Sequence, residues 1–166
     1  MANKASFTPE EWKRLLESPM LASIAVTTAE PSGLWGMLKE SFAAGGRLAK
    51  VKIDAGANEL IKAVVTEFES GEGRAAARDG LQARLKGSKP GEAKDKAVQG
   101  LREVAALLDA KAPNDAAAFK AWLQSIGQHV AEAAKEGGFL GFGGVQVSDA
   151  EKATLNEISS ALNLRA

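Results

Sequence analysis

Hydrophobic and polar positions along this chain repeat at helical spacing. Apolar residues recur three and four positions apart, and no segment shows the sustained alternation of a half-buried strand. The pattern predicts helices at roughly 9–18, 19–29, 34–52, 74–86 and 92–111. Three more helices are predicted from their starts: one capped by Asn58, a long one that begins within residues 112–115, and a last one that begins at Ser148. We therefore expect an all-α fold: a single compact domain over 1–166, a bundle of about seven to eight helices with a flexible N-terminus at 1–7.

Two proline sites carry the signals of a helix start. Thr8 can accept from free backbone N–H groups, Pro9 suits the first helical position, and Glu11 completes a capping box. Ser18-Pro19 has the same chemistry, which predicts that one helix ends and the next begins there. Residues 19–29 are apolar nearly all round, so this second helix is expected in the centre of the bundle.

Composition restricts the chemistry. The chain has no cysteine, one histidine, and 21 basic against 21 acidic side chains. Thiol chemistry, Cys-ligated metals and a multi-histidine site within one chain are excluded. A net charge of zero gives no reason to expect nucleic acid as a partner. Because there is no apolar run of membrane-spanning length and no secretory leader pattern, we expect a cytoplasmic protein without membrane insertion.

Two glycine-containing loops resemble each other. The first covers residues 30–36 and the second 136–141; each has an acid at its head, follows a largely apolar helix and pairs two apolar residues with glycine. Acids also lie near the start of the helix that follows each loop. The likeness is open to two interpretations: a pseudo-twofold internal repeat, or a chance match of a few positions.

The C-terminal stretch has a more specific pattern. Residues 145–158 read VQVSDAEKATLNEI and continue through 161–164 as ALNL. This stretch resembles the end of the tellurite-resistance TerB-like domains. The resemblance implies an all-helical bundle with a repeated helix–loop–helix and a role in tellurite- and metal-linked stress responses. Neither loop here has the aspartate that is typical of that family.

Acidic metal-binding loops are a further implication of the resemblance. Hard cations such as Ca²⁺ or Mg²⁺ need several converging oxygens. The candidate ligands are the acids of the two loops and of the helices after them: Glu30, Glu40, Glu136, Asp149 and Glu151. The alternative is that Asp149 and Glu151 only cap their helix and that the loop acids are solvated.

The glycine-rich segment 137–147 is the second candidate. A phosphate-binding loop is disfavoured because no lysine follows the last glycine and no strand precedes it. Phe139, Leu140 and Phe142, with Trp35 beside the other loop, could instead form a hydrophobic surface that docks a second protein or another copy of this chain. Alternatively, these aromatic residues fill the core.

An enzyme is the weakest hypothesis. His129 lies on the predicted long helix with Ser125 and Glu132 at helical spacing, but such spacing is too common to identify a catalytic triad. We therefore expect a non-enzymatic, stress-associated domain that binds a divalent metal through its loop acids, or a protein-interaction module that docks through segment 137–147.

Overall fold

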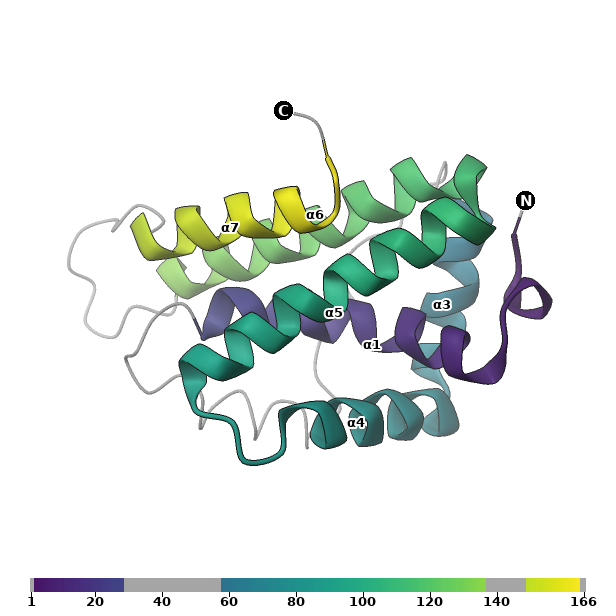
Figure 1. Cartoon of the computed structure of the whole chain (residues 1–166), viewed down its shortest axis with the longest axis horizontal. Coiled ribbons are helices and arrows are strands. Elements are labelled where there is room, and N and C mark those ends of the chain that lie inside the picture. The colour runs from purple at the N-terminus through teal and green to yellow at the C-terminus, as the bar shows by residue number, and fades with distance from the viewer. Residues whose placement is uncertain (1, 29–57, 137–148, 165–166) are drawn as a thin grey trace.

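The computed structural model describes residues 2–28, 58–136 and 149–164. These residues are helical, with no strand among them (Figure 1). In chain order the elements are a short 3-10 helix η1 (Lys4–Ser6) and the α-helices α1 (Pro9–Thr27), α3 (Glu59–Glu69), α4 (Gly71–Leu85), α5 (Pro90–Lys111), α6 (Pro113–Glu136) and α7 (Asp149–Ala161). The all-α expectation is confirmed for this part of the chain.

Helix α1 forms the centre of the bundle. In Figure 1 it lies behind α5, with α6 and α7 on one side and α4 on the other. It contacts all five of the other described α-helices, and every residue from Leu15 to Val26 is buried. The prediction of a central apolar helix is therefore confirmed, although its start is not at Pro19.

The predicted break at Pro19 is wrong. Helix α1 runs without interruption through this proline. A proline inside a helix removes the N–H that would bond the carbonyl four residues earlier, here that of Leu15. The Ser18 hydroxyl donates to this carbonyl at 2.7 Å, so the buried oxygen keeps a partner and the helix continues.

Helices α3 and α4 meet at a tight corner, with only Ser70 between them (Figure 1). Asn58 caps α3 as predicted, its side chain accepting from the backbone N–H of Leu60 at 2.8 Å. Ser70 caps α4 through the N–H of Gly73 at 3.0 Å, so this helix begins at Gly71 and not at the predicted residue 74. Glycine is required at 73 because an added Cβ would lie 2.0 Å from the Glu67 carbonyl oxygen.

The remaining described helices lie where the hydrophobic periodicity of the sequence predicts them. Helix α5 matches the segment predicted at 92–111, and α6 buries its predicted apolar residues Phe119, Leu123 and Ile126. The described ranges contain six α-helices rather than seven to eight. The fusion at Pro19 removes one, and the helix predicted at 34–52 lies outside the described residues, as do residues 30–36 of the proposed internal repeat and most of 136–141.

Ion pairs between helices hold the periphery of the bundle. Lys111 of α5 contacts Glu11 of α1 at 2.7 Å, and Lys94 of α5 contacts Glu157 of α7 at 3.2 Å. Exposed pairs of this kind contribute little individually, so the apolar contacts of α1 remain the main source of stability. Within the described ranges, no helix combines the length and apolar character needed to cross a membrane.

Candidate functional site

Only two of the five predicted metal ligands have described side chains. Glu30 and Glu40 lie outside the described residues, and Glu136 ends α6 without a described side chain. Asp149 and Glu151 both belong to the first turn of α7. Across the described ranges, no group of three or more His, Asp or Glu side chains is arranged to hold a metal ion.

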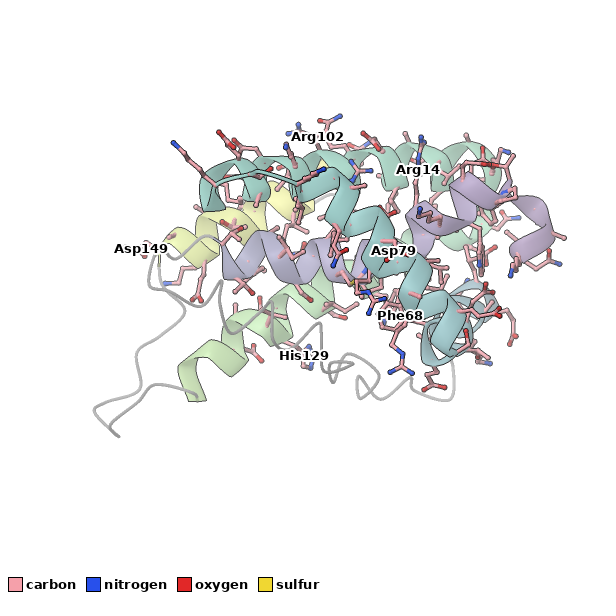
Figure 2. The ribbon with its side chains drawn as sticks, turned by 90° about the horizontal axis from the view of Figure 1, so that it is seen from below. Arg14, Phe68, Asp79, Arg102, His129 and Asp149 are labelled. Carbon is pink, nitrogen blue, oxygen red and sulfur yellow. The ribbon has the colours of Figure 1, made fainter. Side chains whose placement is uncertain are left out.

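The two described α7 acids point in different directions. Residues two apart on a helix are separated by roughly 200° around its axis. The Asp149 side chain is fully exposed, 3.9 Å from Lys152, and it lies at one end of the bundle in Figure 2. Glu151 is only 6% exposed. In the described structure these two carboxylates therefore do not lie on one face of the helix.

The predicted docking residues cannot be placed. Trp35, Phe139, Leu140 and Phe142 all lie outside the described residues. The structure does define what flanks segment 137–148, since α6 ends before it and α7 begins after it. These two helices pack closely at Gly127, where an added Cβ would lie 3.3 Å from Leu155 and 3.4 Å from Ile158. The segment therefore joins two helices of one packed pair.

His129 is exposed on the outer side of α6 (Figure 2). Its Nδ1 atom lies 2.7 Å from the main-chain carbonyl of Ser125, while the Ser125 hydroxyl donates to the carbonyl of Trp122 at 2.7 Å. Glu132 accepts from Gln128 at 2.8 Å. The side chains of His129, Ser125 and Glu132 thus each have a hydrogen-bond partner within α6, and they do not form a nucleophile–base pair.

A cluster of three charged side chains between helices α1, α4 and α5 is the most unusual polar feature of the described core. Glu17 of α1 is 5% exposed. Arg84 of α4 lies between two carboxylates, with Nε 3.8 Å from Oε2 of Glu17 and Nη2 3.2 Å from Oε2 of Glu103 on α5. One guanidinium therefore links three helices.

Two glycines give this cluster its close packing. A Cβ at Gly80 of α4 would lie 1.8 Å from Oε1 of Glu17, so the carboxylate rests directly against the α4 backbone. A Cβ at Gly100 of α5 would lie 3.4 Å from the guanidinium carbon of Arg84 and 2.7 Å from Leu21. The absence of side chains at both positions allows the charged groups to be enclosed.

Burial dominates the electrostatics of Glu17. Loss of solvent raises the pKa of its carboxyl group above the ordinary value, and repulsion from Glu103 acts in the same direction. Arg84, Lys13 and Arg14 act in the opposite direction and offset burial only in part. A buried ion pair whose desolvation exceeds its attraction is weak evidence for stability, so this cluster needs another explanation.

Sequence reasoning did not find this cluster. Glu17 and Arg84 are far apart in the chain, and no local motif connects them. The one available signal is that Glu17 lies between the apolar pairs Leu15-Leu16 and Met20-Leu21, where an acid is expensive unless it is paired.

Two further buried charges connect helices. Asp115 of α6 accepts from the backbone N–H of Ala2 at 2.8 Å and from the Asn58 side chain at 2.5 Å. Lys120 of α6 is 6% exposed and donates to both carboxylate oxygens of Asp109 on α5, at 2.6 and 2.7 Å. The charged groups of Asp115 and Lys120 are thus both hydrogen-bonded within the fold, which indicates a structural role.

An open groove of about 440 Å³ follows the outer side of α5. Its walls include Arg84 of α4 and Glu157 of α7, and its floor is provided by α5 residues Asp95, Lys96, Val98, Gln99 and Arg102. Three basic and two acidic side chains line it, so its charge favours no ligand of one sign strongly.

Comparison with known proteins identifies no relative. No protein-family model, no curated protein sequence and no solved structure matches this chain.

Proposed function

We propose that this chain is a non-enzymatic, cytoplasmic domain of the TerB-like, stress-associated kind, and that it acts by binding a partner protein. The proposal rests on the TerB-like pattern of residues 145–164 together with a described structure whose elements are all helices. Within that proposal, two modes of action compete: a metal held by loop acids, and a protein docked on segment 137–147.

The divergence of Asp149 and Glu151 favours the protein partner. A divalent-cation site at the start of α7 needs oxygens that converge within a few ångströms. One of the two acids is fully exposed and the other is buried. This observation carries the choice of partner binding over metal binding.

The flanking helices support docking through segment 137–147. Binding segments are effective when a rigid scaffold fixes their two ends, because less conformational freedom is lost on binding. Here the ends belong to α6 and α7, which pack against each other. Phe139, Leu140 and Phe142 supply the apolar side chains that a protein partner would bury.

Photo-crosslinking tests the docking proposal. A photo-reactive amino acid replaces Phe142 in one variant and the exposed Gln82 of α4 in a matched control. We expect a discrete protein adduct, either with another protein or with a second copy of this chain, only from position 142, and its loss when Phe139→Ala is added. Equal labelling from both positions, or none from 142, would contradict the proposal.

Thermal melting distinguishes a metal site from docking of a partner protein. Under the docking proposal, Ca²⁺, Mg²⁺, Mn²⁺ and Zn²⁺ leave the melting temperature unchanged. A ligand at 100 times its Kd stabilises a fold by about 2.7 kcal/mol, which raises melting by several degrees. Such a rise, lost in Glu136→Gln or Glu30→Gln, would replace partner binding with a metal site.

A further inference from the structure

We propose that α4 is a proton-coupled opening element: its closure on α1 and α5 encloses Glu17, and its opening lets Glu17 release a proton to solvent. The inference concerns the described cluster of Glu17, Arg84 and Glu103, and it does not depend on the proposed partner binding.

The apolar attachment of α4 is thin. Its buried residues are Gly73, Ala77 and Leu81, of which only the leucine has a large side chain. Hydrophobic stabilisation scales with the apolar area removed from water, so α4 gains much less from burial than α1 does. Helices with few buried apolar side chains are the ones that open locally without global unfolding.

The groups beneath α4 make its opening an electrostatic event. The Glu17 carboxylate rests against the backbone at Gly80, so its shielding from water depends on α4 being in place. Among described residues, the charged groups that act on it are Lys13 and Arg14 of α1, Arg84 of α4 and Glu103 of α5. When α4 moves away, Glu17 regains solvent.

The direction of the pH dependence follows from this geometry. Burial under α4 raises the pKa of Glu17 above the ordinary 4.5, and solvent returns it toward that value when α4 opens. The closed state therefore holds the proton more tightly than the open state. By linkage, the open population rises with pH above 4.5 and levels off above the pKa that Glu17 has in the closed state.

Hydrogen exchange of the whole chain measures this opening. Exchange is followed from pH 4.5 to about pH 8, and each rate is divided by the intrinsic rate of its peptide, with α6 as internal reference. We expect protection of α4 to fall with rising pH, by about tenfold for each pKa unit between the closed and open states. Protection of α6 is expected to stay level.

Substitution at Glu17 isolates the titrating group. Glu17→Gln keeps the shape of the side chain but cannot ionise, so its α4 protection should be independent of pH. Glu103→Gln should keep a pH dependence, reduced because the repulsion that Glu103 exerts on Glu17 is removed. A slope that survives in Glu17→Gln, or α4 protection that follows α6 at every pH, would overturn the proposal.

A glycine pair provides a readout that does not involve removing a charge. Gly80→Ala places a methyl group 1.8 Å from Oε1 of Glu17, so the flexible end of this side chain must move away from the α4 backbone and the pH dependence of α4 protection should weaken. Gly71→Ala, in the same helix with nothing within 4 Å of the added Cβ, should keep the wild-type pH dependence. Equal pH dependence in the two variants would show that closure of α4 on Glu17 does not control its opening.

Discussion

The side chain of Ser18 donates a hydrogen bond to the main-chain carbonyl of Leu15, with 2.7 Å between Oγ and the oxygen. This carbonyl is the one that Pro19, lacking an N–H, leaves without a helical partner. Ser18 and Leu15 are both completely buried, so water cannot replace the missing N–H donor. The serine thus makes a proline tolerable in the middle of the central helix.

Ser18→Ala is expected to destabilise the protein by about 1–3 kcal/mol, the cost of a buried polar group left unpaired. Ser23→Ala is the matched control. The Ser23 hydroxyl also donates to a carbonyl, that of Pro19 at 3.1 Å, but α1 continues beyond Ser23 and this carbonyl keeps its helical N–H partner. Urea unfolding should show the larger loss for Ser18→Ala.

A double-mutant cycle sharpens this comparison. Pro19→Ala restores the backbone N–H that can bond the Leu15 carbonyl, so Ser18→Ala should cost less in that background. Equal costs with and without Pro19 would show that the serine acts by some means other than replacing the missing donor.

Asp115 should contribute stability that is lost in acid. The Ala2 amide and then the Asn58 side chain hold the pKa of this buried carboxyl below its usual 3.8. The stabilisation is therefore present above the unfolded-state pKa and disappears as pH falls through the folded-state pKa. Asp115→Asn should cost about 1–3 kcal/mol at neutral pH, measured by urea unfolding.

The pH profile distinguishes this effect from a simple loss of packing. The difference between wild type and Asp115→Asn should begin to shrink as pH falls through the ordinary value of 3.8 and disappear below the lowered pKa of the folded state. Asp79→Asn, at an exposed position in the interior of α4, serves as a control and should change stability much less. A difference that is constant across pH would argue against the hydrogen-bonded carboxylate.

Local signals in the sequence were sufficient for most helix boundaries. The capping box at Thr8 is present, with the Glu11 N–H bonded to the threonine hydroxyl at 3.2 Å and the Thr8 N–H to the Glu11 carboxylate at 2.8 Å. The same type of signal failed at Ser18-Pro19. A serine before a proline begins a helix when exposed, but in a buried helix the serine can repair the proline defect, and only tertiary packing decides between the two.

Long-range pairing was beyond sequence reasoning. Periodicity identifies α1 and α4 separately, but no spacing rule indicates that Gly80 will rest on Glu17 or that Arg84 will lie between two acids. Such contacts depend on how the helices cross. Of the predicted site residues, only Asp149 and Glu151 have described side chains, and their helical offset alone implied that they diverge.

Lys120 and Asp109 should respond asymmetrically to substitution. Lys120 is buried while Asp109 is half exposed, so Asp109→Ala leaves a buried ammonium without its carboxylate. We expect that change to cost about 2–4 kcal/mol, whereas Lys120→Met, which keeps the apolar stem, should cost less. Thermal unfolding measures both. A larger loss for Lys120→Met would show that the ammonium itself stabilises the α5–α6 contact.

Gly73 should be the least replaceable glycine of the described helices. An added Cβ would lie 2.0 Å from the Glu67 carbonyl oxygen and 2.6 Å from its carbon, and these backbone atoms cannot rotate away. Gly73→Ala must therefore separate α3 from α4. The strain of such overpacking, about 1–3 kcal/mol, exceeds the gain of about 1 kcal/mol from replacing glycine in a helix.

Gly91→Ala is the control because nothing lies within 4 Å of its added Cβ, and its stability should be equal to or above that of wild type. If thermal unfolding ranks Gly73→Ala at or above Gly91→Ala, the α3–α4 corner is more adaptable than its backbone contact indicates, and the α3–α4 packing is not set by this glycine.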